Sequence, residues 1–315
     1  MEIVYLGAYI KQKREELGLT QAQLCEGICE PMTLSRMENG KQTPSRIRIN
    51  ALLQRLGLPD DRYFALLPKN ELEIENLLQE IGRYALRFCR APETDRPRIR
   101  AEALEKIAAL EAAAEPDDRV TRQEALGFRA SIGKPEGPYT LEERLELLME
   151  AIRLTVPRFD PENIGANRYS TREIKIINQI AISYKQAGQL ERAIAMYRDL
   201  MAYLEAYAQD LDGFARYYCL IASNCAIALE AAKRYEEAAE LAEKGWRLCV
   251  RSGHYQSLPS FLGVLAECAL AEGDREKSAA LYCQSYYLYR ATSDEYAASV
   301  VKREMEKMLG VGPPY

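Results

Sequence analysis

The sequence predicts an all-α protein in which a small N-terminal domain precedes a longer array of paired helices. Apolar residues recur every three or four positions from residue 71 to residue 309, which is the period of an amphipathic helix, and the alternation typical of strands is absent. The first 67 residues contain short helical patterns separated by cap and turn residues. The chain has 315 residues, of which 48% are hydrophobic, so about two well-buried domains are expected.

The N-terminal domain is predicted to span residues 1–67 and to open with a helix from about Val4 to Leu17. Thr20 is placed to cap a second, short helix that runs from Gln21 to about Gly27. Gln23, three residues after Thr20, completes a capping box, because its side chain can bond back to the backbone N–H of the cap.

A third helix is expected to start near Glu30, with Pro31 in the first turn, where a missing N–H has no consequence. Leu34 and Met37 form its inner side, and Gly40 ends it in a left-handed conformation. The residues left on or near its outer, N-terminal side are Pro31, Met32, Thr33, Ser35 and Arg36.

This stretch resembles the helix-turn-helix of phage-repressor-like bacterial regulators over roughly residues 4–58. The residues that carry the resemblance are Leu19-Thr20-Gln21, Leu34-Ser35-Arg36-Met37-Glu38-Asn39-Gly40-Lys41 and Pro44-Ser45. The resemblance implies an internal ion pair between Arg14 and Glu38, whose loss would leave a buried charge without its partner. The alternative is that these are two solvated surface charges.

Two further helices complete the domain. The fourth is expected from Pro44-Ser45 to about Leu56, and the fifth from about Asp60 to Leu67. Pro68-Lys69-Asn70 marks the boundary of a second domain, predicted over residues 68–315. Asn70 with Glu73 repeats the cap signature and opens a linker helix over about residues 71–90.

The second domain reads as helix throughout, with Gly/Pro-rich breaks. The expected helices are Asp95–Ala114, Arg119–Ser131, Leu141–Val156, Thr171–Ala187, Leu190–Ala208, Gly213–Ala232, Tyr235–Arg251, Tyr255–Ala271, Asp274–Arg290 and Asp294–Leu309.

Internal repeats then set the architecture of this domain. Ala181, Tyr184, Gly188, Ala193 and Tyr197 match the core of a tetratricopeptide unit, in which small residues let two helices approach closely. The same separation of twelve recurs in two further pairs, Ala226 with Ala238 and Ala266 with Ser278. The fold predicted is therefore a five-helix helix-turn-helix domain followed by a tetratricopeptide-like right-handed α-solenoid with a concave groove.

The outer side of the third helix is the candidate DNA-binding site. Arg36 is placed to donate two hydrogen bonds to a guanine edge, which gives about 1–3 kcal/mol of discrimination, while Met32 and Thr33 suit a thymine methyl group. Other residues suit phosphates and set the register. The candidates are Gln21, Pro31, Met32, Thr33, Arg36, Asn39, Lys41 and Arg46. The alternative for Arg36 is that it covers the surface or pairs with an acid.

The concave groove is a candidate peptide-binding site. An asparagine amide such as that of Asn178 can satisfy both the N–H and the C=O of an extended peptide, and basic residues suit a peptide carboxylate or acidic side chains. Asn178 bonded internally is the structural alternative. The candidates are Arg172, Lys175, Asn178, Ile182, Lys185, Arg216, Leu220, Ser223, Asn224, Ile227, Gly263 and Glu267.

The order of the two domains resembles the RRNPP family, the peptide-pheromone-responsive regulators of Gram-positive bacteria. Glu26-Gly27-Ile28-Cys29 and Ile177-Asn178-Gln179-Ile180-Ala181 look like family sequence, and Asn178 matches the asparagine that such proteins use on a peptide backbone. The resemblance implies a homodimer, a short signalling peptide as ligand, quorum sensing and control of nearby genes.

Charge is consistent with a nucleic-acid partner at one end only. The net charge is −5, but residues 1–58 hold eight Lys/Arg and six Asp/Glu, so that this part carries +2 and the remainder −7. A mildly basic module on an acidic body fits a regulator that contacts double-stranded DNA with one end, as a homodimer to gain affinity.

Enzyme, metal and membrane functions are disfavoured. The chain has one histidine, no Gly-rich phosphate loop and no C-x-x-C, so neither catalysis, a cofactor nor a metal site is expected. The eight cysteines are interpreted as reduced thiols that pack as small apolar residues. With no signal peptide and no 18-residue apolar run, a soluble cytoplasmic protein is expected.

The function predicted is a sequence-specific transcription regulator whose groove binds a short linear peptide that switches its activity. Two alternatives remain open: a tetratricopeptide adaptor that binds a protein partner, or a constitutive regulator without a peptide ligand.

Overall fold

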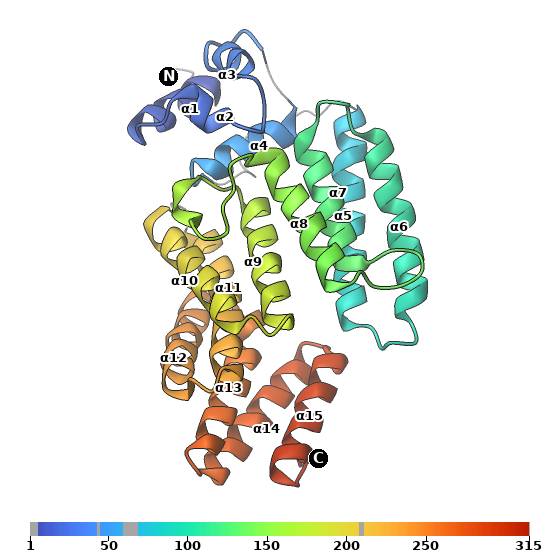
Figure 1. The fold of residues 1–315 in the computed structure, drawn as a ribbon, viewed down its shortest axis with the longest axis vertical. Coiled ribbons are helices and arrows are strands. Elements are labelled where there is room, and N and C mark those ends of the chain that lie inside the picture. Colours follow the sequence, from blue (N-terminus) through green and yellow to red (C-terminus); the bar gives the residue numbers. More distant parts are fainter. Residues whose placement is uncertain (1–5, 43–44, 59–68, 208–210, 315) are drawn as a thin grey trace. The chain divides into compact units, whose positions relative to one another are not determined.

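The computed structural model describes residues 6–42, 45–58, 69–207 and 211–314 (Figure 1). The predicted all-α class is confirmed, since these residues form fifteen α-helices and two short 3-10 helices, with a single isolated β-bridge between Lys134 and Gly137. The chain divides into two compact units. Unit 1 comprises residues 1–89 and 95–180, and unit 2 comprises residues 90–94 and 181–315.

The first four helices of unit 1 are α1 (Leu6–Glu16), α2 (Gln21–Cys25), α3 (Pro31–Glu38) and α4 (Arg46–Arg55). The predicted capping box is present, because Thr20 Oγ1 accepts from the backbone N–H of Gln23 while Gln23 Oε1 accepts from that of Thr20. Pro31 occupies the first turn of α3, and Gly40 beyond its end has a φ of 67°. The predicted fifth helix over 60–67 and the domain boundary at 67/68 lie outside the described residues.

Apolar side chains from all four helices form the core of this domain. Ile10, Leu24, Leu34 and Leu52 are fully buried. Helices α1 and α3 approach closely at Gly7, where a Cβ atom would lie 1.9 Å from the carbonyl oxygen of Met37. The core therefore holds the inner face of α3 and leaves its opposite face exposed to solvent.

The remaining helices of unit 1 are α5 (Lys69–Arg90), α6 (Arg96–Ala113), α7 (Arg119–Ile132), α8 (Leu141–Thr155), η1 (Ile164–Ala166) and the first part of α9 (Thr171–Gln186). Helix α5 already includes Asn70, so the prediction that Asn70 precedes the helix as its cap is wrong. Helix α7 packs between α6 and α8, as expected of antiparallel neighbours joined by short loops.

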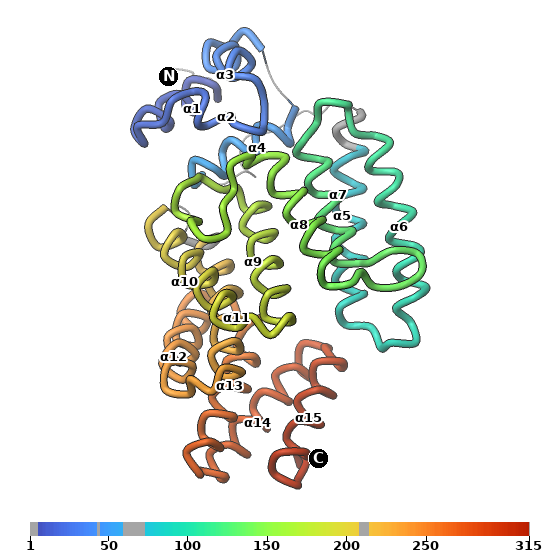
Figure 2. The backbone as a smooth tube through the Cα atoms, viewed as in Figure 1, coloured from blue at the N-terminus to red at the C-terminus, as the bar shows by residue number. Residues whose placement is uncertain are grey.

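Unit 2 contains the end of α9 and then α10 (Leu190–Tyr207), α11 (Leu211–Ala231), α12 (Tyr235–Ser252), η2 (Tyr255–Ser257), α13 (Leu258–Ala271), α14 (Arg275–Ala291) and α15 (Glu295–Leu309). The helix expected from Tyr255 instead begins as η2 and becomes α-helical at Leu258, with Pro259 in its first turn. Figure 2 traces these helices as successive antiparallel pairs.

The small residues that defined the repeat all lie where helices pack. Ala181, Ala193, Ala226, Ala238, Ala266 and Ser278 are each 0% exposed. Helices α11 and α12, and likewise α13 and α14, are in close contact along their lengths. The repeat interpretation is therefore confirmed at the positions that carried it.

All eight cysteines are free thiols, and five are buried: Cys25, Cys219, Cys225, Cys249 and Cys268. Burial raises the pKa of Cys268 to about 11 and that of Cys225 to about 12, as expected of thiols that pack as apolar groups. Cys89, on α5, is exposed and does not fit that interpretation.

Candidate functional site

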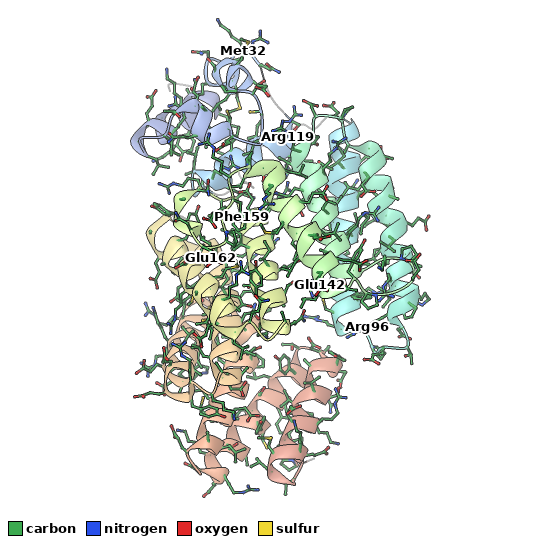
Figure 3. All side chains as sticks on the ribbon, in the orientation of Figure 1. Met32, Arg96, Arg119, Glu142, Phe159 and Glu162 are labelled. Carbon is green, nitrogen blue, oxygen red and sulfur yellow. The ribbon has the colours of Figure 1, made fainter. Side chains whose placement is uncertain are left out.

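Helix α3 presents the predicted reading face to solvent. Met32 is 66% exposed, Pro31 and Arg36 are exposed, and Thr33 is half-buried. Figure 3 shows Met32 at the outer tip of this domain. Within the described part of the chain Arg36 forms no ion pair, which leaves its guanidinium group available to a ligand.

The opposite side of α3 is fixed by a buried polar cluster. The ion pair implied by the resemblance is present: Arg14 Nε donates to Glu38 Oε1 at 2.7 Å and Arg14 Nη2 donates to Glu38 Oε2 at 3.0 Å. The hydrogen bond to Glu38 raises the pKa of Arg14. Gln21 Nε2 also donates to Glu38 Oε2, at 2.7 Å, so the amide group expected at a phosphate is engaged inside the domain.

The other DNA-binding candidates surround α3. Asn39 is exposed and its amide donates to the carbonyl of Ser35 at 2.7 Å, while Lys41 is exposed just beyond the helix end. Arg46 is half-buried in the first turn of α4. Glu30 occupies the cap position of α3, but its side chain does not cap the helix.

Sequence reasoning missed a buried hub around Arg55, the last residue of α4. Arg55 is 3% exposed, and its Nη1 donates to the carbonyls of Leu24 at 3.1 Å and Glu26 at 2.6 Å. Its Nη2 donates to the carbonyl of Thr155 at 2.8 Å and to Glu173 Oε1 at 2.9 Å. One guanidinium group thus joins the turn of the helix-turn-helix to the last turn of α8 and the first turn of α9.

Glu173 completes this hub from the repeat side. Its Oε2 accepts from the backbone N–H of Ser170, as in a capping box at the start of α9, while its Oε1 also accepts from the hydroxyl of Thr155 at 2.6 Å. Gln54 Oε1 accepts from the backbone N–H of Thr171 at 3.2 Å. The S-x-x-E spacing of Ser170 and Glu173 was a visible signal for this cap, but nothing local marked Arg55 as its partner.

The candidates for the peptide site belong to both compact units. In unit 1, Lys175 is exposed and Asn178 is 6% exposed. Arg172 pairs with Glu124 at 2.7 Å, and its Nη1 is buried without a hydrogen-bond partner among the described residues. This part of α9 therefore offers one exposed cation and one buried guanidinium with a spare donor.

In unit 2 the candidates of α11 follow one face of the helix. Arg216 is exposed, Leu220 is 38% exposed, and Asn224 and Ile227 are half-buried. Ser223 is 4% exposed, and its hydroxyl donates to the carbonyl of Leu220 at 2.9 Å. The hydroxyl is thus engaged within its own helix.

Helices α9 and α13 complete the set in unit 2. Gly263 faces open space, since no atom beyond its own stretch of helix lies within 4 Å of the position a Cβ would take, and Glu267 accepts from the hydroxyl of Tyr282. Ile182 is half-buried. Burial lowers the pKa of Lys185, and the nearby Glu230 opposes that shift. Lys185 therefore already has a carboxylate beside it, which the sequence did not indicate.

A separate hollow of about 660 Å³ lies on α8 and is lined by Leu145, Glu146, Met149, Glu150, Arg153 and Leu154. None of these was a candidate in the sequence. Among the described residues no group of three or more His, Cys, Asp or Glu lies close enough to hold a metal ion. In the same part of the chain, no helix combines the length and apolar character needed to cross a bilayer.

An exposed helix held by a buried ion pair, followed by tetratricopeptide-like helix pairs, defines a class of protein: a helix-turn-helix regulator with a repeat domain. Residues 10–62 match the helix-turn-helix family HTH_3. A comparison with curated protein sequences finds no match.

Solved structures with the same fold include two of one regulator. PlcR of Bacillus thuringiensis in complex with the peptide PapR7 and DNA is 19% identical, with 94% of this chain and 98% of that chain covered and a TM-score of 0.57. Its apo form is 17% identical over 94% and 97% of the chains, with a TM-score of 0.51.

The pheromone receptor Rgg2(C45S) of Streptococcus dysgalactiae is 14% identical over 96% and 99% of the chains, with a TM-score of 0.50. At the level of the fold, these likenesses confirm the predicted resemblance to peptide-responsive regulators. The matched helix-turn-helix family agrees with the prediction that the chain is not an enzyme.

Proposed function

We propose that this chain is a sequence-specific DNA-binding transcription regulator whose repeat-domain groove binds a short linear peptide, as a cytoplasmic homodimer in a quorum-sensing circuit. The observation that carries the DNA-binding part is the two-sided α3: Arg36 and Met32 are exposed, while Glu38 on the same helix is locked to Arg14. A recognition helix needs one exposed face and one fixed face, because contacts with base edges are lost when the helix changes its orientation.

The peptide-binding part is supported by exposed groups on the repeat helices and by one unsatisfied donor, Nη1 of Arg172. Lys175, Arg216 and the spare donor of Arg172 suit carboxylates, while Leu220 and the open space beside Gly263 suit a side chain and an extended backbone. The solved PlcR structure holds both a peptide and DNA, which makes the same pair of ligands a reasonable expectation for this fold.

The test begins with selection of duplexes from a random DNA library by the full-length protein. Arg36→Ala is expected to reduce the ratio of affinities for selected and random duplexes by about 10- to 100-fold, because a bidentate arginine–guanine contact is lost. Arg119→Ala, an exposed arginine on α7, is the matched control and should leave the ratio unchanged. An equal loss on both kinds of duplex would make Arg36 a phosphate contact, and failure to enrich any duplex would favour the adaptor function.

The peptide is tested separately, with mature peptides encoded by short secreted reading frames beside the gene. Asn178→Ala and Lys175→Ala should each weaken the effect of an active peptide on DNA binding without changing basal DNA binding. A dose response that matches wild type in both variants would remove these residues from the site. If none of the peptides has an effect on wild type, constitutive regulation becomes the better interpretation.

A further inference from the structure

The hub around Arg55 has no role in either binding site, yet it joins the helix-turn-helix domain to the start of α9, which carries peptide-binding candidates. It joins the last turn of α4 to the first turn of α9, and Glu173 is only two residues from Lys175 and five from Asn178. The contacting residues all belong to unit 1. We propose that the Arg55–Glu173 pair sets the orientation of the helix-turn-helix on α8 and α9, and so transmits movements of α9 to α3. The link to a ligand rests on the proposed function.

The first argument is geometric. The two terminal nitrogens of Arg55 bond in different directions, Nη1 to the carbonyls of Leu24 and Glu26 in the helix-turn-helix turn and Nη2 to Thr155 and Glu173. Because a guanidinium group is a rigid plane, a displacement of α9 must either break the Nη2 bonds or move the turn that precedes α3. The position of the turn before α3 is therefore tied to the position of α9 through a single side chain.

The second argument is the closeness of the two backbones. Gly27, in the turn between α2 and α3, has a φ of 75°, and a Cβ atom there would lie 2.0 Å from the carbonyl oxygen of Thr155. That carbonyl is also an acceptor for Arg55. The turn thus rests directly on the end of α8, and no side chain is present to absorb a shift.

The third argument concerns the chemistry of the seam, which is the buried contact between the helix-turn-helix turn and the ends of α8 and α9 around Arg55. Arg55, Glu173, Thr155 and Gln123 are each 3% exposed or less, and Gln123 donates to both the carbonyl of Ala151 and the hydroxyl of Thr155. An apolar seam would hold two elements together as well or better. Charged and polar groups, in contrast, regain hydration when the seam opens, and Arg55 Nε is buried without a partner among the described residues even when it is closed. Such a seam fixes an orientation and still permits release.

Two further ion pairs join α4 and the turn before α3 to segments outside the helix-turn-helix domain. Arg48 of α4 lies 3.0 Å from Asp117, and Arg158 lies 3.4 Å from Glu26. Their partners are partly or largely solvent-exposed, so they contribute little to stability. They favour one orientation of the helix-turn-helix domain, but they add little to the free energy needed to change it.

The test uses the full chain with Glu173→Gln, which lies outside the helix-turn-helix domain and preserves side-chain size. Amide hydrogen exchange over residues 24–29 is expected to accelerate by about tenfold or more in this variant, because the charged acceptor of Arg55 is lost. Exchange over α3 itself should match wild type. Arg55→Met should show the same pattern, and Arg129→Met, which removes an arginine paired with Glu111 away from the seam, is the matched control.

A DNA readout separates positioning from a merely structural role. The probes are the duplex selected by wild type, an isolated half-site, and duplexes with the half-site spacing changed by one or two base pairs. Glu173→Gln should reduce discrimination between spacings by about 5- to 150-fold, the usual range of a coupling between sites, and leave half-site affinity within about twofold of wild type.

Unchanged hydrogen exchange over 24–29 or unchanged spacing discrimination in a folded Glu173→Gln protein would overturn the proposal. Loss of half-site affinity together with faster exchange throughout the domain would also overturn it, because the hub would then only stabilise the fold. If no duplex is selected by wild type, the proposed function fails, while the exchange experiment still decides whether Arg55 and Glu173 position the turn.

Discussion

At the scale of single residues, buried charges stabilise the N-terminal domain. Arg14 and Glu38 are held by two parallel hydrogen bonds, and Arg14 Nη1 also donates to the carbonyl of Leu19 at 2.9 Å. Removal of one partner from such a pair leaves the other charge buried and uncompensated, which is much more damaging than loss of a surface pair.

Arg14→Met is therefore expected to destabilise the helix-turn-helix domain by about 3–5 kcal/mol. Hydrogen exchange of the α1 and α3 amides, compared with wild type, measures this locally in a chain of two units. Lys13→Ala, which removes the exposed pair with Glu16, is the neighbouring control and should have no measurable effect. Equal effects of the two substitutions would show that Glu38 is stabilised by other groups.

A pH effect is expected at Glu237 on α12. Hydrogen bonds from Arg234 and then Arg198 lower the pKa of Glu237 to about 2. A carboxyl group whose pKa is lower in the folded state stabilises the fold above its unfolded pKa of about 4.5, and this contribution disappears as the pH falls towards 2.

The stability difference between wild type and Glu237→Gln is thus expected to be constant above pH 4.5 and to shrink at lower pH. Thermal unfolding between pH 7 and pH 2.5 measures it, with Glu240→Gln, at an exposed glutamate of α12, as the control. A difference that grew on acidification would contradict the assigned direction of the pKa shift.

At the scale of secondary-structure elements, backbone contacts between helices matter as much as side chains. Gly18 and Gly27 both have positive φ values, of 66° and 75°, but only Gly27 would place a Cβ atom against another element. Substitution of Gly18 therefore measures the loss of stability caused by the backbone conformation alone, while substitution of Gly27 adds the loss caused by a steric clash.

Gly18→Ala is expected to cost about 1 kcal/mol from its backbone conformation alone. Gly27→Ala should cost substantially more, since the turn must move away from Thr155. Denaturant unfolding followed by hydrogen exchange in the α2–α3 turn distinguishes the two. Similar losses in both variants would mean that the turn does not rest on α8 in solution.

At the scale of the whole molecule, the basic excess of residues 1–58 is modest, so the proposed regulator is expected to need two copies of the domain for tight DNA binding. For a palindromic duplex bound by a homodimer, Lys41→Ala should lower the slope of log Kd against log salt concentration by about 2, and for a half-site by about 1. Fluorescence anisotropy over a salt series measures both slopes.

Lys233→Ala, an exposed lysine of unit 2, should leave both slopes unchanged. Equal changes of about 1 on the palindromic duplex and the half-site would show that a single copy binds, which contradicts the homodimer.

Much of the fold was predictable because the relevant interactions are local. The Thr20–Gln23 capping box, Pro31 at the start of α3 and Gly40 beyond its end all follow from residues three or four apart. The buried small residues of the repeats were predictable for the same reason, since their spacing reflects the approach of consecutive helices.

The site was only partly predictable. Exposure of Met32 and Arg36 followed from helical periodicity, whereas the contact of Gln21 with Glu38 and the carboxylate beside Lys185 depend on how separate helices are placed. Arg55 looked like one more charged residue at the end of a helix, and its partner Glu173 is 118 residues away.

By itself, then, the sequence determined the helices, their caps and the side of α3 that faces outward, because hydrogen bonds and apolar periodicity within a helix involve only near neighbours. Only the tertiary structure decided which charges are buried and what they hold together. Desolvation and hydrogen bonding of a group such as Arg55 depend on whatever the fold brings against it, and no local pattern records those neighbours.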